Sequence, residues 1–246
     1  MEKFSVDGLV IKTGVTGESD RIVFILTAQR GVIRAFAKGA RNTKSRLHAG
    51  TSLFAYCAFT LSENKGVYNV NEAPVKEIFF DLRSDLERLT VAQYFCEVML
   101  KTVPEENSAP EYLRLILNSL HFLCRGNKPV LLIKSVFELR LVCFAGYMPG
   151  LVACDVCSEF ETDVMYFDCL SGALYCKNCG KMKNVPDVSA SVVAAMRYIV
   201  FSDFEKIFSF ELAEDQLAKL NRLTEVYLSN CFQQQFRTLD FLHSAT

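Results

Sequence analysis

The chain has 246 residues, a formal net charge of −1 and a half-hydrophobic composition with 20 Phe and no Trp. Such a chain folds into one to three globular modules, and its composition excludes a disordered or fibrous protein. The charged N-terminus and the lack of any run of about 18 apolar residues predict a cytoplasmic protein with no membrane partner.

The first eighty residues read as short strands. Alternating or apolar segments, separated by Gly, Asn and Ser, cover residues 3–12, 21–27, 31–38, 52–62 and 66–73. Five strands without a long helix between them are typical of a small antiparallel barrel of the oligonucleotide-binding (OB) type, and they do not fit a parallel α/β layout. We therefore predict an OB-fold domain over residues 1–80.

Positive charge is concentrated in this barrel. The window 21–62 holds seven Arg or Lys and no acid, so it carries +7, and the remainder carries about −8, the difference between −1 and +7. In the strand 31–38, the period of two puts Arg34, Phe36 and Lys38 on one face. Because burying unpaired cations costs several kcal/mol, this face should point outward.

An outward ring between two cations suits single-stranded nucleic acid, because bases stack on the ring and phosphates meet the charges. The next segment, 39–50, is polar and basic, and we expect a mobile loop that extends the phosphate track. No base-reading motif is present, so binding should be independent of sequence. The predicted binding residues are Arg34, Phe36, Lys38, Arg41, Lys44 and Arg46. The alternative is a solvated basic face with Phe36 covered by the helical domain.

From Ser84 onward the pattern is helical. Capping boxes at Ser84–Glu87 and Ser108–Glu111 predict two helices, the first ending before Pro104. A buried helix is expected within 129–150, and further helices that pack back on the first three are expected at 188–201 and 211–233. We therefore predict a helical domain over residues 81–150 and 184–246.

Residues 151–183 interrupt this domain with two CxxC pairs. The cysteines stand in a C-x2-C-x18-C-x2-C arrangement: Cys154, Cys157, Cys176 and Cys179. This spacing indicates a zinc ribbon, and four thiolates leave no open position, so we predict one structural Zn²⁺. The formal charge of −2 could be offset by Lys177, Lys181 and Lys183. The alternatives are reduced cysteines or two labile disulfides.

Signatures of catalysis are missing. His48, His121 and His243 are isolated, and the chain has no HExxH, GxSxG or Walker A motif. Glu18 and Asp20 are better explained as residues that cap a turn or pair with a cation. We therefore expect no enzymatic activity.

The order of these parts resembles the RecO family of bacterial recombination mediators over essentially the whole chain. The most specific pieces are the E-x-D of residues 18–20, the A-K-G-A-R of 37–41, the G-Y-x-P of 146–149 and the two cysteine pairs. Two positions depart from the family. Ser158 stands where a glycine is frequent, and Ser171 stands where two glycines are often found, so turn geometry rather than metal ligation is affected.

The resemblance implies an α+β multidomain protein: an N-terminal OB-fold β-barrel and a C-terminal helical bundle with an inserted zinc ribbon that has four cysteine ligands. It implies a non-enzymatic mediator of recombinational DNA repair that anneals strands and, with RecR, loads RecA onto DNA coated with single-strand-binding protein. Implied partners are single- and double-stranded DNA, RecR, the C-terminal tail of single-strand-binding protein and, indirectly, RecF and RecA. The implied location is the cytoplasm, at the nucleoid.

Three residues of the helical domain, Arg114, Arg125 and Arg140, are candidates for the rim of the pocket that this resemblance implies for the acidic tail. Two other functions stay open. A zinc-stabilised scaffold that binds only proteins could use the basic face for an acidic partner, and an RNA-binding factor would need the same electrostatics.

Overall fold

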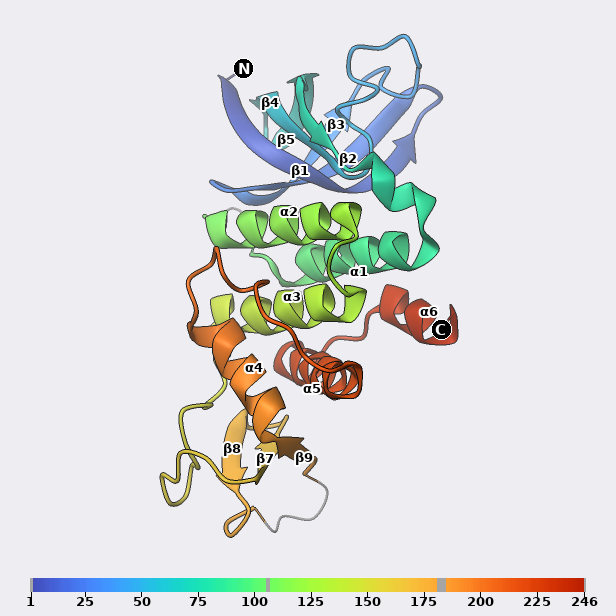
Figure 1. Ribbon diagram of the computed structural model, residues 1–246. Coiled ribbons are helices and arrows are strands. Elements are labelled where there is room, and N and C mark those ends of the chain that lie inside the picture. Colours follow the sequence, from blue (N-terminus) through green and yellow to red (C-terminus); the bar gives the residue numbers. More distant parts are fainter. Residues whose placement is uncertain (1, 105–106, 181–184, 246) are drawn as a thin grey trace. The chain divides into compact units, whose positions relative to one another are not determined.

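The computed structural model describes residues 2–104, 107–180 and 185–245. The chain folds into two compact units (Figure 1): one comprises Met1–Gly126 with Phe236–Thr246, and the other comprises Asn127–Gln235. The last helix therefore belongs with the N-terminal half of the chain. The predicted division at residues 80, 151 and 183 remains a prediction.

The first unit contains the expected barrel. Its strands are β1 (Glu2–Thr16), β2 (Asp20–Thr27), β3 (Gly31–Ala37), β4 (Ala55–Asn64) and β5 (Val67–Glu72). They pair in the order β1-β2-β3-β5-β4, and β4 pairs back with β1, so the sheet closes. The OB-fold prediction is confirmed. A strand that the sequence did not predict, β6 (Val75–Ile78), adds to β4.

Strand β1 is longer than predicted because it serves two partners. Its first half pairs with β4, its second half pairs with β2, and Gly8 and Leu9 pair with both. A side chain at Gly8 would place its Cβ 2.4 Å from Cγ2 of Ile25. Glycine is therefore required where the strand passes from one partner to the other.

Alternation along the strands builds the barrel core. In β3, Ile33, Ala35 and Ala37 are buried, whereas Arg34 is exposed and Phe36 is partly exposed. Phe59 and Leu61 of β4 are fully buried in the same core. The predicted orientation of β3 is thus confirmed: its apolar residues fill the interior, and its cation points outward.

Helices follow the barrel in the same unit. They are the 3-10 helix η1 (Phe80–Ser84), α1 (Leu86–Thr102), α2 (Pro110–Arg125) and α6 (Arg237–Ala245), which packs on α1. The last helix predicted from the sequence ends at residue 233, so α6 was not predicted as a separate helix, although the predicted helical domain extends to residue 246. Among the described residues, no helix is long and apolar enough to cross a bilayer.

Both predicted capping boxes are wrong, because neither serine is the N-cap residue: Asp85 caps α1, and Ala109 precedes α2 without a side-chain cap. Ser84 Oγ donates to the carbonyl of Asp81 at 2.6 Å, and Asp85 caps α1 by accepting from the Arg88 amide at 3.1 Å. Ser108 Oγ donates to the carbonyl of Ala28 in the β2–β3 turn at 3.2 Å. Each helix therefore begins one residue later than the predicted cap implies, α1 at Leu86 and α2 at Pro110.

The second unit is built on three helices: α3 (Val130–Phe144), α4 (Ala190–Phe201) and α5 (Glu214–Phe232). Helix α3 is buried on its polar side as well as its apolar sides. Lys134 Nζ lies 2.7 Å from a carboxylate oxygen of Glu138 and 2.8 Å from one of Glu225, and Thr224 donates to Glu138 at 2.6 Å. The buried charges of Lys134 and Glu138 are thus paired with each other and bound by side chains of α5.

The cysteine-containing segment forms a small antiparallel sheet in the second unit. Its strands β7 (Val164–Asp168), β8 (Ala173–Cys176) and β9 (Asp187–Ser189) pair in the order β8-β7-β9. The sequence did not predict these strands individually. Their few buried apolar residues include Met165, Phe167 and Leu174.

Candidate metal centre and nucleic-acid interface

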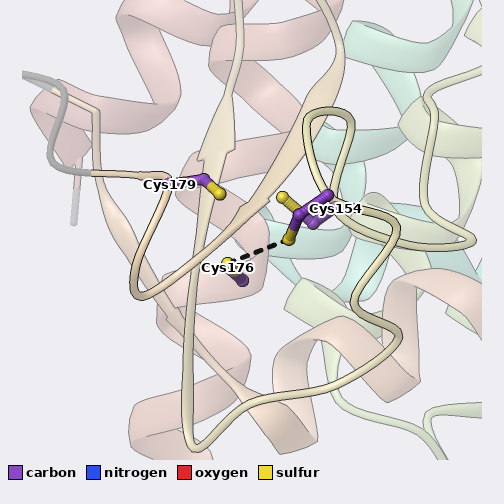
Figure 2. A group of neighbouring side chains, drawn as sticks. Cys154, Cys176 and Cys179 are labelled. Carbon is purple, nitrogen blue, oxygen red and sulfur yellow. Dashed lines mark hydrogen bonds between the residues drawn. The ribbon is translucent and has the colours of Figure 1, made fainter.

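The four predicted thiols lie together. Sγ atoms of Cys154, Cys157, Cys176 and Cys179 are all within 4.8 Å of one another. Figure 2 shows the sulfurs of the three labelled cysteines facing a common space between the loop before β7 and the end of β8. Residues 154–157 and 176–179 thus present two thiols each from a tight turn, as the CxxC spacing predicted.

Backbone hydrogen bonds shape both turns. The Ser158 amide donates to the carbonyl of Cys154 at 2.9 Å, and the Cys154 amide donates to the carbonyl of Glu159 at 2.8 Å. The amides of Cys179 and Gly180 donate to the carbonyl of Cys176 at 3.2 and 2.8 Å. The thiols are therefore positioned by local backbone rather than by a surrounding apolar core.

The arrangement fits a tetrahedral thiolate site. Four sulfurs about 2.3 Å from one metal ion would be about 3.8 Å apart, and Sγ of Cys157 lies 3.6 Å from Sγ of Cys176. Burial raises the pKa of Cys154, but amides of Cys157, Cys176 and Val156 outweigh it and lower that pKa to about 6. Contacts with the thiols of Cys157 and Cys176 raise the pKa of Cys179 to about 12. The four clustered sulfurs can therefore hold a metal ion, whose positive charge would favour the thiolate forms.

The surroundings of the cysteines are acidic. Residues 151–163 contain four exposed carboxylates and no base: Asp155, Glu159, Glu161 and Asp163. Of the lysines predicted to offset the thiolate charge, Lys177 is exposed beside the second pair, while Lys181 and Lys183 lie outside the described residues. This segment is therefore unlike the basic barrel in its charge.

Arg197 of α4 holds the acidic segment. Its guanidinium donates to the carbonyls of Leu151 and Phe160 at 2.8 and 2.6 Å, and it lies 4.1 Å from the centroid of the Phe160 ring. The sequence did not single out this residue, because its partners are backbone carbonyls far away in the chain.

On the barrel, Arg34 and Phe36 form a cation–ring pair on the outer face of β3. The Arg34 guanidinium lies 5.7 Å from the centroid of the Phe36 ring. Lys38, the next outward residue, is exposed. None of the five cations in the predicted binding set makes an ion pair with another described residue.

A groove of about 760 Å³ lies over this face. Arg34 and Phe36 line it together with Phe24, Tyr68 and Arg30 from the neighbouring strands and turn. The remaining predicted residues do not line it. The structure therefore brings together two of the six predicted residues with others that the sequence prediction did not include, among them the acidic Glu63, which lies 4.0 Å from Arg30. Strand pairing, and not local pattern, places them there.

The other four predicted residues, Lys38, Arg41, Lys44 and Arg46, follow β3. Residues 39–50, predicted to be a mobile loop, contain successive turns with hydrogen bonds such as that from the Ser45 amide to the Asn42 carbonyl at 2.9 Å. Arg21 Nη1 donates to the carbonyl of His48 at 3.2 Å and fixes the end of the loop. The loop therefore presents its exposed cations from a defined backbone.

Glu18 and Asp20 hold the start of this loop. Asp20 accepts from the Gly39 amide at 2.7 Å, and the carbonyl of Glu18 accepts from Arg41 Nη1 at 2.9 Å. This is the turn-capping role predicted for Asp20. One of the suggested rim residues of the helical domain, Arg140, is partly buried and donates to the carbonyls of Ile199 and Val200 at 3.2 and 2.8 Å.

Comparisons with known proteins cover both parts of the chain. The family model described as "Recombination protein O N terminal" matches residues 1–79, and the one described as "Recombination protein O C terminal" matches residues 83–240. The chain is 38% identical to a protein of Acetivibrio thermocellus named "DNA repair protein RecO", over 98% of this chain and 97% of that protein.

Two further relatives carry the same name. A protein of Alkaliphilus metalliredigens is 30% identical over 90% of this chain and 91% of its own length. A protein of Dehalococcoides mccartyi is 28% identical over 98% of this chain and 95% of its own length. Similarity therefore extends over the barrel, the helices and the cysteine-containing segment alike.

Proposed function

The chain belongs to the RecO family of DNA repair proteins, and from this premise we propose that it is a non-catalytic mediator that binds DNA through the outer face of its barrel. The observation that carries the proposal is the groove in which Arg34 and Phe36 lie side by side. The Phe36 ring can stack on bases, and the Arg34 guanidinium can contact phosphates.

The contacts in the groove favour binding without regard to sequence. Arg34, three aromatic rings and the pair of Arg30 with Glu63 line it. Its described lining contains no Asn or Gln, the side chains that pair with the donor and acceptor of an adenine edge. Lys38, Arg41, Lys44 and Arg46 extend positive charge beyond the groove. Single strands should bind best because their bases can leave the stack, and duplex DNA would bind through its phosphates alone.

We also propose that the four thiols hold one structural Zn²⁺. Zinc prefers a tetrahedron of thiolates, and the 3.6 Å sulfur–sulfur distance suits it. With all four positions taken by Cys154, Cys157, Cys176 and Cys179, no site is left for a reacting water. The ion would then stabilise the fold of residues 151–180 rather than take part in chemistry.

The partners proposed with this function follow from the family. They are RecR, the C-terminal tail of single-strand-binding protein and, indirectly, RecF and RecA, and the protein would anneal strands and help RecA onto coated DNA at the nucleoid. The support is the match of both family models along the chain.

A salt titration tests the proposal. If four to six phosphate contacts form, the logarithm of the affinity for a fluorescent poly(dT) strand should fall with the logarithm of salt with a slope of roughly −3 to −4. The double variant Arg34→Ala/Lys38→Ala should have a slope smaller by about 1.4, since two contacts are lost. Zinc content is measured on the same samples.

Two results would contradict the proposal. A flat salt response, or equal affinities of the double variant and the natural protein, would favour the scaffold that binds only proteins. Competition of poly(dT) with poly(U) separates the RNA-binding alternative, because tighter binding of poly(U) would require a contact to the 2′-hydroxyl.

A further inference from the structure

A second cavity adjoins the groove on the barrel. It has a volume of about 580 Å³ and lies between β1, α1 and α6 of the same compact unit. Leu100 of α1 lines both the cavity and the groove, so the two hollows meet at this residue. No family match assigns a role to the second cavity.

The second cavity carries net positive charge. Its charged lining residues are Lys12, Lys101, Arg237 and Glu97. The Glu97 carboxylate already has partners within the protein. It accepts from the amides of Arg237 and Thr238 at 3.2 and 3.0 Å and from Lys101 at 2.7 Å. The side chains of Lys12 and Arg237 are exposed and make no ion pair with another described residue.

Strand register connects the two hollows. Lys12 pairs across the sheet with Phe24, and Phe24 pairs with Arg34, so cation, ring and cation stand in one row on three strands. Lys12 Nζ lies 5.2 Å from the centroid of the Phe24 ring. A bulge between Val10 and Lys12 sets this register, and bulges commonly re-aim a side chain in this way.

We propose that a single strand of DNA does not end at the barrel face but follows this row over Phe24 to Lys12 and continues into the second cavity. There Lys12 and Arg237 contact phosphates, and the apolar wall formed by Leu53 and Leu100 accepts a base. The C-terminal helix α6 thereby becomes part of the DNA-binding surface. The inference rests on the proposed function, because it extends the same binding track.

The experiment compares a short and a long strand, (dT)8 and (dT)20, because an OB fold alone covers about 4–16 nucleotides. In salt titrations of the full-length protein, Lys12→Ala/Arg237→Ala should reduce the slope for (dT)20 by about 1.4 and leave the slope for (dT)8 nearly unchanged. Arg125→Ala is the matched control, since Arg125 is exposed in the same unit and lines neither hollow.

The outcomes separate this inference from the proposed function. If Lys12→Ala/Arg237→Ala binds (dT)20 like the natural protein while Arg34→Ala/Phe36→Ala weakens binding, the strand stays on the barrel and the inference is wrong. If Arg34→Ala/Phe36→Ala has no effect, the proposed barrel site is wrong, whatever the other variant does.

Photocrosslinking of the natural protein gives a readout that does not depend on any variant folding. Single 4-thiothymidines placed along (dT)20 should crosslink to peptides with Phe24 or Phe36 at some positions. At positions further along the strand they should crosslink to peptides covering residues 93–101 or 237–242. Crosslinks confined to the barrel peptides would overturn the inference.

Discussion

The barrel and the cysteine module, residues 151–180, are both small β structures, yet they are stabilised by different means. The barrel closes around a core with fully buried side chains such as Phe59, Leu61 and Ile25. The module contributes two strands, β7 and β8, to a three-stranded sheet with few buried apolar residues, and it holds four clustered thiols. A closed sheet with its own core needs no ligand to fold, whereas a small sheet with few buried side chains gains much more from a bound metal ion.

The same two regions differ in charge. The barrel window 21–62 has seven bases and no acid, whereas residues 151–163 have four acids and no base. A polyanion is therefore attracted by one region and repelled by the other. In this chain, the region with its own closed apolar core is also the region with the excess of positive charge.

Metal removal is the sharpest way to test this difference and should have the largest effect. Chelation, or Cys176→Ser, should unfold residues 151–180 because a structural zinc site contributes on the order of 10 kcal/mol. Hydrogen exchange should then show loss of protection in β7 and β8 but not in the barrel. Cys169→Ser is the control, since this buried thiol is outside the cluster. Unchanged protection of the module after chelation would refute the dependence on metal.

The reverse test removes the core of the barrel. Phe59→Ala should lower the free energy of unfolding of the first unit by about 3–5 kcal/mol, because it leaves a cavity in a closed core. Phe80→Ala, at a side chain that is 60% exposed, should have a small effect. Urea unfolding followed by hydrogen exchange measures both. A loss below about 1 kcal/mol for Phe59→Ala would mean that the barrel does not depend on its core.

A smaller effect concerns the contact that holds α6 to the barrel unit. Burial disfavours the Glu97 carboxylate, but Lys101, the Thr238 hydroxyl and two amides donate to it and lower its pKa to about 2. A lowered pKa contributes stability above the ordinary value near 4.5, and this contribution is lost as pH falls toward 2. The protection of the α6 amides from hydrogen exchange, corrected for the intrinsic rate at each pH, should therefore fall over this pH range.

Glu97→Gln should remove that pH dependence and cost about 1–2 kcal/mol, since a carboxylate cap is replaced by a neutral amide. Glu72→Gln, at an exposed position of β5, is the control. Retention of the acid-dependent exchange of α6 in Glu97→Gln would assign the effect to another group.

The smallest predicted effect is at the first cysteine pair. Ser158 has φ +61°, a conformation that costs a residue with a Cβ about 1–2 kcal/mol and glycine nothing. Ser158→Gly should therefore tighten zinc binding modestly in a chelator competition. Gly172→Ala should do the opposite, because its Cβ would lie 2.6 Å from the hydroxyl of Tyr227. A weaker site in Ser158→Gly would mean that the serine has a contact that outweighs the strain.

Local patterns predicted much of this molecule. The period of two in 31–38 was sufficient to orient Arg34 and Phe36, because side-chain direction in a strand depends only on position along it. The CxxC spacing was sufficient to bring two thiols from each turn to one place. The capping boxes failed because Asp85 caps α1 in place of Ser84, and because Ser108 lies one residue before the N-cap position of α2, where its hydroxyl donates to the carbonyl of Ala28.

The sequence by itself therefore determined the barrel, the orientation of its basic strand, the cysteine cluster and the family. Only the tertiary structure decided that Lys12 stands opposite Phe24, that Lys134 is buried with Glu225 of another helix, and that Glu97 caps a helix 140 residues away. The physical reason is the distance along the chain over which each kind of signal acts. Periodicity and spacing act between neighbours in the chain, whereas these contacts join segments that only strand pairing and helix packing bring together.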